Sequence, residues 1–357
     1  MLFAFKIGRN GMMKKEIGVL FLFFNKTETT EKVLQRILEC KPETLLLAQD
    51  GPRQGNQYDQ NAVPECREKV EKLIEKIDWP CEIYRNYSEI NMSCDPREFS
   101  AISWAFQIVD KLIILEDDCL CSDSFFPYME ELLIRYEYDE RISMICGMER
   151  FGKNPYCNDS YYFTQACSGW GWGTWKRCWD DVEEISKDYD YLDDKNFMQI
   201  LNYYIKNCCI RVYSNYIVES QLNREYNRKT RMIQSWEFAM STSMVLKSRL
   251  AINPTVNLVK NVGVVEGATH SGNDIRLIPH RYRRIFELEN YELEFPLSHP
   301  KYMIRDVQYE QMHDRNFTVN WLKKLGDDIE HTFLYIRYGQ LKQLGQGIKR
   351  RIQRHGK

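Results

Sequence analysis

Apolar and polar residues alternate in blocks along the first half of the chain, and the blocks predict strands and helices in turn. The runs of strand length are rich in Ile, Leu, Val and Phe, and they lie at 17–24, 44–48, 81–85, 112–115 and 142–146. Between them, apolar residues recur at helical spacing over 29–38, 63–77, 99–109 and 125–136. Such alternation is typical of an α/β fold, in which a mostly parallel sheet is wrapped by helices.

The run at 112–115 leads directly into three carboxylates, Glu116, Asp117 and Asp118. Like charges repel one another and resist burial, so this position favours a bound cation. Ligands of α/β proteins bind at the carboxyl ends of the strands, and Mg²⁺ and Mn²⁺ prefer oxygen ligands. The triplet therefore predicts a site for a metal-bound diphosphate. The alternative is a solvated acidic turn after a core strand.

Polar residues also follow the other predicted strands. Asn25 follows the first strand, Asp50 and Arg53 lie in an Asp-Gly-Pro-Arg turn after the second, and Arg85 with Asn86 ends the third. Because parallel strands end at the same edge of a sheet, these side chains and the triplet are expected to line one nucleotide cleft.

The second half of the chain is marked by tryptophans and glycines. The segment 169–175 reads Gly-Trp-Gly-Trp-Gly-Thr-Trp, and its Trp170 and Trp172 are candidates for contact with a sugar. Core tryptophans anchoring a glycine turn are an equal alternative. Further on, Trp236 and Glu237 open a predicted helix that runs to Leu246.

Composition narrows the class of protein. Of 357 residues, 43% are hydrophobic and 28% charged, as in a globular protein, and a net charge of -2 gives no reason to expect nucleic acid binding. The twelve cysteines are irregularly spaced, which favours free, mostly buried thiols in the cytoplasm over disulfides. The apolar run at 17–24 is too short to span a bilayer.

Several motifs together resemble nucleotide-sugar glycosyltransferases of the GT-A fold. They are Phe-Asn-Lys-Thr at 24–27, Asp-Gly-Pro-Arg at 50–53, Ile-Leu-Glu-Asp-Asp at 114–118, the tryptophan block at 169–177, Trp-Glu at 236–237, and the segments 257–263 and 268–270. The likeness covers about residues 17–275 and is greatest to bacterial family 2-like enzymes and to N-acetylglucosaminyltransferase I. Related sequences commonly place a glycine shortly after the third strand, where this chain has Asn91-Met92-Ser93.

The resemblance implies a GT-A (Rossmann-like) fold with a C-terminal helical extension. We expect an N-terminal extension over 1–16, a nucleotide-sugar-binding half over 17–150, an acceptor half over 151–278, and a C-terminal extension over 279–357. The implied reaction moves a sugar from a nucleoside-diphosphate sugar, with a UDP-sugar favoured, to a hydroxyl of a glycan or lipid-linked acceptor. The reaction is expected to invert the configuration at the sugar carbon. The enzyme is expected to require Mn²⁺ or Mg²⁺.

The resemblance also implies a role for each candidate residue. The metal would be bound by Asp118, with His270 as a possible further ligand at the metal or diphosphate. The residues expected to bind the nucleotide sugar are Asn25, Thr27, Asp50, Arg53, Arg85, Glu116, Asp117, Trp170 and Trp172. Glu237, beside Trp236, is the expected catalytic base that takes the proton of the acceptor hydroxyl, and Asp180 and Asp181 are its rivals.

The C-terminal segment suggests a different partner. Leu and Ile alternate with Lys and Arg over 334–354, which predicts a basic amphipathic helix at the inner membrane surface; a solvated basic tail is the alternative. Two other function classes remain open. A sugar-phosphate nucleotidyltransferase would need a glycine-rich phosphate loop after the first strand, where this chain has none. A non-catalytic carbohydrate-binding protein would leave the acidic triplet unexplained.

Overall fold

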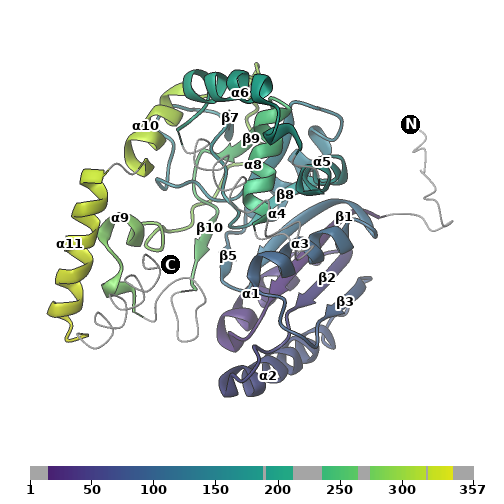
Figure 1. Cartoon of the computed structure of the whole chain (residues 1–357). Coiled ribbons are helices and arrows are strands. Elements are labelled where there is room, and N and C mark those ends of the chain that lie inside the picture. The colour runs from purple at the N-terminus through teal and green to yellow at the C-terminus, as the bar shows by residue number, and fades with distance from the viewer. Residues whose placement is uncertain (1–14, 188–189, 212–234, 264–273, 319–320, 341–357) are drawn as a thin grey trace, which may run out of the picture.

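The computed structural model describes residues 15–187, 190–211, 235–263, 274–318 and 321–340, and Figure 1 shows their arrangement. Eight strands form one sheet in the order β3-β2-β1-β4-β8-β6-β9-β7. These strands are β1 (Lys15–Phe23), β2 (Thr44–Gln49), β3 (Glu82–Tyr87), β4 (Val109–Glu116), β6 (Ile142–Cys146), β7 (Tyr161–Thr164), β8 (Trp172–Trp175) and β9 (Leu250–Pro254). The α-helices are α1 (Thr27–Glu39), α2 (Gln57–Ile74), α3 (Cys94–Ala105), α4 (Phe125–Arg135), α5 (Lys176–Lys187), α6 (Lys195–Cys208), α8 (Trp236–Leu246), α9 (His280–Arg283), α10 (Val307–Phe317) and α11 (Trp321–Arg337).

The N-terminal half of the sheet is parallel. β1 pairs in parallel with β2 on one side and with β4 on the other, and β2 pairs in parallel with β3. Alternate side chains of β1 enter two cores, because Phe21 packs with residues of α1 and α2 whereas Leu20 packs with residues of α3. Both faces are therefore covered, which explains why the β1 sequence is continuously apolar. The helix predicted over 99–109 begins earlier, at Cys94, and ends at Ala105.

The sheet reverses direction at β8, which is antiparallel to both β4 and β6. The register sets Trp172 beside Ile114 and Trp175 beside Lys111. β8 therefore begins near the carboxyl end of β4 and finishes near its amino end, and α5 starts from that opposite edge. The predicted α/β class with helices flanking the sheet is confirmed, and the second half of the sheet mixes parallel and antiparallel pairs.

A second, two-stranded sheet joins distant parts of the chain. β5 (Cys119–Cys121) follows the acidic triplet and pairs antiparallel with β10 (Val259–Asn261), so that Cys119 lies opposite Asn261. This ladder brings the residues after β10 against Asp118.

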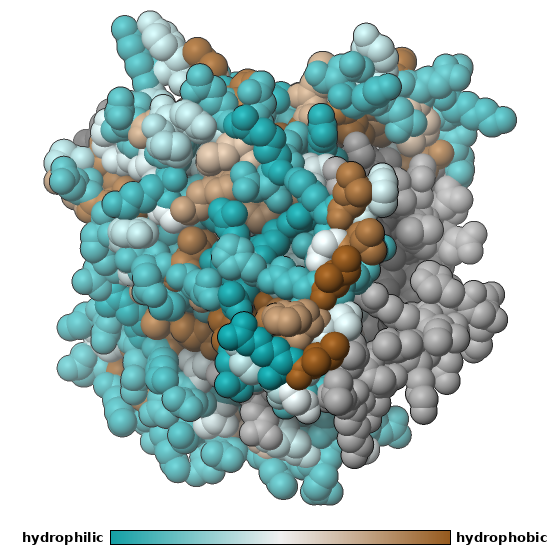
Figure 2. Space-filling model, turned by 90° about the vertical axis from the view of Figure 1, so that its left-hand side faces the viewer, coloured by the Kyte–Doolittle hydropathy of each residue, from teal (hydrophilic) through white to brown (hydrophobic). Residues whose placement is uncertain are grey.

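The C-terminal extension is helical, and α11 exposes an apolar row. Its inner side packs near η2 (Ile275–Leu277) and α9 through the buried Leu334 and through polar contacts such as the ion pair of Arg281 with Asp327. Figure 2 shows brown apolar side chains in a line on this face of the molecule. The exposed apolar residues of α11 are Trp321, Leu322, Leu325, Ile329, Phe333 and Ile336. The apolar face thus lies earlier than the predicted 334–354 segment, of which residues from 341 onward fall outside the described residues.

Two further expectations concern thiols and membrane spans. All twelve cysteines are free, as predicted, but only Cys66, Cys119, Cys121, Cys146 and Cys178 are buried, so burial is less general than expected. Within the described ranges, no helix combines the length and the apolar content needed to cross a bilayer.

Candidate active site

The acidic triplet lies at the carboxyl edge of the parallel strands. Glu116 ends β4 and pairs with Leu22 of β1, so Asp117 and Asp118 lie beside the segment that follows β1. The backbone N–H of Phe24 donates to Oδ2 of Asp117 over 3.0 Å. Strand pairing therefore fixes the triplet against the loop between β1 and α1.

Lys26 supplies the positive charge next to the triplet. Its Nζ lies 2.7 Å from Oδ2 of Asp118 and 3.3 Å from Oδ1 of Asp117, and its side chain is only 12% exposed. Burial by itself would lower the Lys26 pKa, but the two carboxylates outweigh it and raise the pKa above its usual value. Lys26 therefore keeps its positive charge in this site.

Asp118 is positioned from the other side by the segment after β10. Nδ2 of Asn261 donates to Oδ1 of Asp118 over 3.1 Å, and the N–H of Val262 donates to the Asp118 carbonyl over 2.8 Å. Gly263 lies so close that a Cβ at this position would overlap Oδ2 of Asp118. Position 263 must therefore be glycine if the Asp118 carboxylate is to keep its present position.

A divalent cation at Asp118 would find the hard oxygen ligands that Mg²⁺ and Mn²⁺ prefer, and the ion pair with the Lys26 ammonium shows that positive charge is stabilised at this carboxylate. In the part of the chain that the structure describes, no three His, Cys, Asp or Glu side chains gather to enclose a metal by themselves. A bound ion would thus take most of its ligands from water or substrate. His270 lies outside the described residues.

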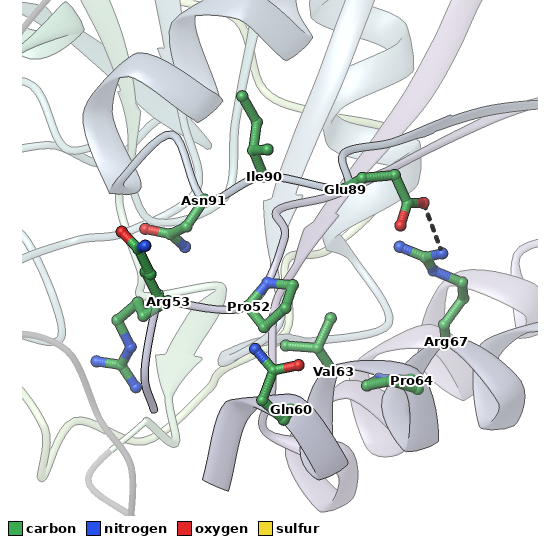
Figure 3. A pocket seen from close by; sticks show the side chains of 10 residues that line it. Pro52, Arg53, Gln60, Val63, Pro64, Arg67, Glu89, Ile90 and Asn91 are labelled. Carbon is green, nitrogen blue, oxygen red and sulfur yellow. Dashed lines mark hydrogen bonds and ion pairs between the residues drawn. The ribbon is translucent and has the colours of Figure 1, made fainter. Parts of the chain in front are cut away.

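An open cleft of about 780 Å³ lies over the ends of β2 and β3. Figure 3 shows side chains from α2 and from the two loops after these strands around it, including Arg53, Arg67 and Asn91. Asp59 at the start of α2 connects the cleft to the β1 end, because it accepts from Nη2 of Arg53 and from Nδ2 of Asn25 over 2.8 Å each.

The predicted nucleotide-binding residues at this edge have different surroundings. Oδ1 of Asn25 is buried and has no hydrogen-bond partner among the described residues, a cost that a ligand N–H would remove. Asp50 is saturated by its own loop and by the loop after β3, accepting from the N–H groups of Gly51 and Met92 and from the Asn91 amide. Thr27 is the half-buried first residue of α1.

Arg85 lies inside β3 rather than after it. The strand continues to Tyr87, and Arg85 forms a bidentate ion pair with Glu71 of α2. Its Nε donates to Oε1 of Glu71 and its Nη2 donates to Oε2, over 2.8 Å each. Its guanidinium is thus committed to a neighbouring helix. The loop after β3 also explains why related sequences have a glycine where this chain has residues 91–93. Ser93 adopts a φ of 73°, a backbone conformation that glycine takes easily.

Two further glutamates, Glu98 and Glu237, lie near Glu116 of the triplet. Glu237 is exposed in the first turn of α8, and its carboxylate lies beside Gly169. Burial first, and then the charges of Glu98, Asp118 and Glu237, hold the pKa of Glu116 well above its usual value. Burial likewise raises the pKa of Glu98 to about 7, with a further contribution from Glu237. The fold therefore brings Glu237 into the same acidic cluster as the triplet.

Glu98 was not among the predicted site residues. It lies on α3 and accepts from Nε1 of Trp236 over 2.5 Å and from the Cys94 thiol over 2.8 Å. The contact fixes the indole next to Glu237. Nothing in the sequence pairs Glu98 with Trp236, since they are 138 residues apart.

The tryptophan block divides between core and surface. Trp172 is 1% exposed and stacks on Trp236 with ring centroids 4.6 Å apart. The proposed sugar contact is therefore wrong for Trp172, because its ring is enclosed by core residues. Trp170 is half-buried and packs against Phe286.

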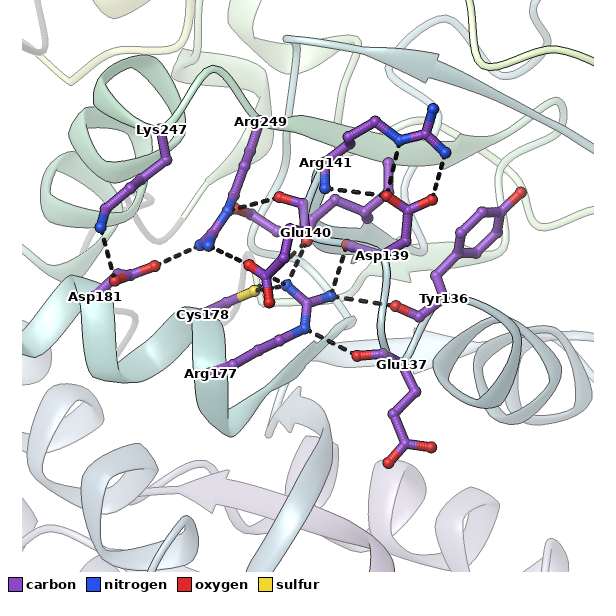
Figure 4. A network of polar contacts seen from close by, with 12 residues as sticks. Tyr136, Glu137, Asp139, Glu140, Arg141, Arg177, Cys178, Asp181, Lys247 and Arg249 are labelled. Atoms are coloured by element: carbon purple, nitrogen blue, oxygen red, sulfur yellow. Dashed lines mark hydrogen bonds and ion pairs between the residues drawn. The ribbon is translucent and has the colours of Figure 1, made fainter.

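The rival bases Asp180 and Asp181 lie away from the triplet. Both are on α5, which starts at the opposite edge of the sheet. Asp181 pairs with Lys247 and Arg249, which follow the C-terminal end of α8, whereas Glu237 is at the N-terminal end of that helix. Figure 4 shows Asp181 in this ion-pair network. Asp180 pairs with Lys176 of its own helix. Neither carboxylate is in the acidic cluster, so among the three predicted bases only Glu237 contributes its charge there.

Lys26 and Asn261 are the other site residues that sequence reasoning missed. Both belong to motifs that carry the family resemblance, at 24–27 and 257–263. Membership in these motifs was the only sequence signal that could have indicated them as site residues. Their contacts with Asp118 depend on the pairing of β1 with β4 and of β5 with β10.

Comparison with known proteins leaves the function to be argued from this geometry. No family model and no curated protein matches the chain. Among solved structures, it is similar to residues 1–349 of S. aureus TarS, at 11% identity and a TM-score of 0.33 over 47% of this chain, and it spans about half (49%) of that chain. It is also similar to a cytidylyltransferase from Leptospira borgpetersenii, at 14% identity and a TM-score of 0.29, covering 54% of this chain and 71% of that one. A third likeness is to 4-diphosphocytidyl-2C-methyl-D-erythritol synthase from Anaerococcus prevotii, at 8% identity and a TM-score of 0.30, covering 48% and 78%. These scores are too low to argue for any activity.

Proposed function

We propose that this chain is a metal-dependent glycosyltransferase. It moves a sugar from a nucleoside-diphosphate sugar, with a UDP-sugar favoured, to a hydroxyl of a glycan or lipid-linked acceptor in polysaccharide synthesis, with inversion at the sugar carbon. The observation that carries the proposal is the position of the Glu116-Asp117-Asp118 triplet at the carboxyl edge of the parallel strands, where Lys26 pairs with it, Glu237 adds its charge to the acidic cluster, and an open cleft lies over the ends of β2 and β3. Ligands of α/β sheets bind at this edge.

The cleft suits the nucleoside, and the triplet suits the diphosphate. Asn25 and Arg53 lie where the β1 end meets the cleft, and Asp118 with its Asn261 contact presents a carboxylate toward the same edge. A divalent cation held by Asp118 would neutralise charge that gathers on the departing diphosphate. Lys26 adds a second positive charge at this place.

Glu237 is the proposed base. It stands at the start of α8, next to Gly169, and faces the same cluster as Glu116. Glu98 is a positioning residue, because its bond to Trp236 fixes the residue that precedes the base. A carboxylate so placed takes the proton of an acceptor hydroxyl while that oxygen bonds to the sugar carbon.

Donor screening tests the reaction class. Purified protein is incubated with Mn²⁺ and a panel of nucleoside-diphosphate sugars, and hydrolysis and thermal stabilisation are measured. We expect one donor to stabilise the protein and to release its nucleoside diphosphate slowly. Release of pyrophosphate from a nucleoside triphosphate and a sugar phosphate would instead identify a nucleotidyltransferase, and sugar binding without any nucleotide effect would identify a carbohydrate-binding protein.

Replacing Asp118 tests the site itself. Asp118→Asn removes the charge but keeps the shape, so Mn²⁺-dependent donor binding measured by calorimetry should largely disappear while the melting curve stays cooperative. Asp180→Asn, at the opposite edge, is the matched control and should bind the donor normally. Equal donor affinity in the two variants contradicts the assignment of Asp118.

We also propose that the protein works at the cytoplasmic surface of a membrane, through the apolar row of α11 and the basic sequence after it. The segment 341–357 contains several Lys and Arg residues and no Asp or Glu, which suits an anionic lipid surface. The row on α11 offers apolar side chains next to that segment.

A further inference from the structure

The strongest unexplained feature of the site is an ion pair that occupies the place of a metal. Lys26 Nζ lies 2.7 Å from Oδ2 of Asp118, the oxygen through which Asp118 would bind a cation, and it also reaches Asp117. All three side chains are nearly buried, at 12%, 8% and 13% exposure. A divalent cation and this ammonium therefore compete for one carboxylate face.

The other oxygens of the pair are already engaged. Oδ2 of Asp117 accepts from the Phe24 backbone, and Oδ1 of Asp118 accepts from Asn261. The remaining two oxygens both contact Lys26. In the described part of the chain, Lys26 is the one Lys or Arg that forms an ion pair with the triplet. Binding of a metal at this face thus requires that Lys26 moves.

A diphosphate provides the reason for such a movement. The lysine side chain is a flexible four-carbon stem with a compact charge, and a phosphate offers it anionic oxygens in exchange for the carboxylates. Lys26 also directly precedes α1, where a backbone N-terminus favours anions. The same side chain can then neutralise the carboxylates in the free protein and the diphosphate in the complex.

Resting on the proposed function, we propose that Lys26 keeps divalent metal out of the free site until a nucleoside diphosphate draws its ammonium away. Metal and nucleotide then bind as a pair, and the free protein holds little metal. Lys26 thus determines that the metal binds together with the nucleotide and not before it. No bond is made or broken in this exchange, and the charge of the ammonium is unchanged throughout.

The test measures Mn²⁺ binding without any nucleotide, from the electron paramagnetic resonance signal of free Mn²⁺. Lys26→Met should bind Mn²⁺ about ten- to a hundredfold more tightly than the native protein, as expected when one nearby unit of positive charge is removed from a partly buried site. Lys32→Met is the matched control, because Lys32 is an exposed lysine of α1 that pairs with Glu28. It should leave Mn²⁺ binding unchanged.

Two further measurements keep the proposal falsifiable. Lys26→Gln retains a donor toward Asp118 without charge and replaces Lys26→Met if that variant does not fold, as judged by circular dichroism. The native protein is also titrated with Mn²⁺ with and without UDP, and it should retain Mn²⁺ well only with UDP. Tight Mn²⁺ binding by the native protein alone, or no gain in a folded Lys26 variant, overturns the proposal.

The outcome separates this inference from the proposed function. If Lys26→Met gains Mn²⁺ affinity but the native protein neither binds nor hydrolyses any nucleoside-diphosphate sugar, Lys26 excludes metal as proposed and the glycosyltransferase assignment fails. If the native protein hydrolyses a donor with Mn²⁺ but folded Lys26 variants gain nothing, the assignment stands and the role of Lys26 fails.

Discussion

At the residue scale, the site depends on partners that hold carboxylates in place. The triplet was recognisable from sequence because three acidic residues after an apolar run are rare in a core. The contacts of its partners Lys26 and Asn261, and the bond of the nearby Glu98 to Trp236, could not be assigned from sequence, because single Lys, Asn and Glu residues are common on surfaces and acquire a role here only through long-range contacts. Residue type thus predicted the acids, and tertiary structure determines what each acid does.

The choice of base is a prediction at this scale. Glu237→Gln should retain donor binding but reduce sugar transfer by about 10²–10⁴-fold, the usual loss for a general base. Transfer to an acceptor is measured under single-turnover conditions once the donor is known. Asp181→Asn is the control and should transfer normally if it folds, since Asp181 belongs to the network with Arg249. Normal transfer by Glu237→Gln would remove Glu237 from the mechanism.

Glu98 leads to a prediction about pH. Its folded-state pKa of about 7 lies above the 4.5 of an ordinary glutamate, so the native state keeps a proton that the unfolded state releases. Stability should therefore fall as the pH rises from about 4.5 through 7. Glu98→Gln removes this loss, so its melting temperature should exceed that of the native protein at pH 8, by about 2–4 °C, and match it more closely at pH 5.

Thermal melts across pH 5 to 8 provide the measurement for Glu98. Glu183→Gln, a substitution on α5 of a carboxylate that pairs with Lys187 of its own helix, is the control for losing one carboxylate. A Glu98→Gln curve parallel to the native one at all pH values would show that Glu98 does not titrate in this window.

At the scale of elements, predictions were best where both faces of a strand are buried. The apolar runs at 44–48 and 142–146 correspond closely to β2 and β6. β4 extends further than its apolar run, because the buried Lys111 is neutralised by Glu137 at 3.1 Å and so is tolerated within the strand. Hydropathy alone does not reveal such a pairing.

β8 is the element that sequence reasoning missed. Its Trp-Gly-Thr-Trp sequence was predicted either to contact a sugar or to form a glycine turn anchored by core tryptophans, yet it is a central strand whose Trp172 and Trp175 enter opposite cores. Glycines and polar residues usually disfavour strands. Here Gly173 lets β8 approach β4, since a Cβ would lie 3.2 Å from the Leu112 carbonyl oxygen. The missed strand also explains why Asp180 and Asp181, which follow the tryptophan block in sequence, lie away from the triplet.

The segment after β10 provides a prediction for an element. Gly263→Ala would push a methyl group into the Asp118 carboxylate, so donor affinity with Mn²⁺ should fall by about tenfold or more, on the scale of 1–3 kcal/mol for overpacking. Calorimetry with the identified donor gives the measurement. Gly326→Ala on α11, where nothing lies within 4 Å, is the control and should stabilise slightly without affecting donor binding. Unchanged affinity in Gly263→Ala would mean that Asp118 tolerates displacement.

At the scale of the whole molecule, the order of the motifs along the chain was more informative than any one of them. The α/β architecture and the common edge of the parallel strands were predicted correctly. The antiparallel pairs made by β8 and β7 in the second half were not, because strand direction depends on connections that local patterns do not encode. The site combines both halves, since Glu237 and Asn261 follow the sheet reversal at β8.

The membrane proposal belongs to this scale. Leu325→Ser with Ile329→Ser on α11, and a chain ending at Gln340, should each bind less to vesicles that contain anionic lipid. The basic residues of the tail contribute about 1 kcal/mol each near such a surface, and this attraction weakens with salt. Donor hydrolysis should be unaffected. Ending the chain at Gln340 leaves α11 complete, since it ends at Arg337.

Sedimentation with vesicles at low and high salt checks the membrane prediction. Ile200→Ser on α6, another exposed apolar residue, is the control and should sediment like the native protein. If all variants sediment with vesicles as the native protein does at low salt, α11 and the tail do not bind membranes.

The ladder between β5 and β10 has a consequence for the order in which the protein folds. Asp118 and Asn261 are 143 residues apart, so their contact closes a very long loop, which is slow relative to local helix and strand formation. The sheet strands β1, β2 and β4 and the helices between them form from nearer segments. The Asp118 carboxylate therefore receives its final orientation among the last events of folding, and a ribosome-bound N-terminal half would carry the triplet without a finished site.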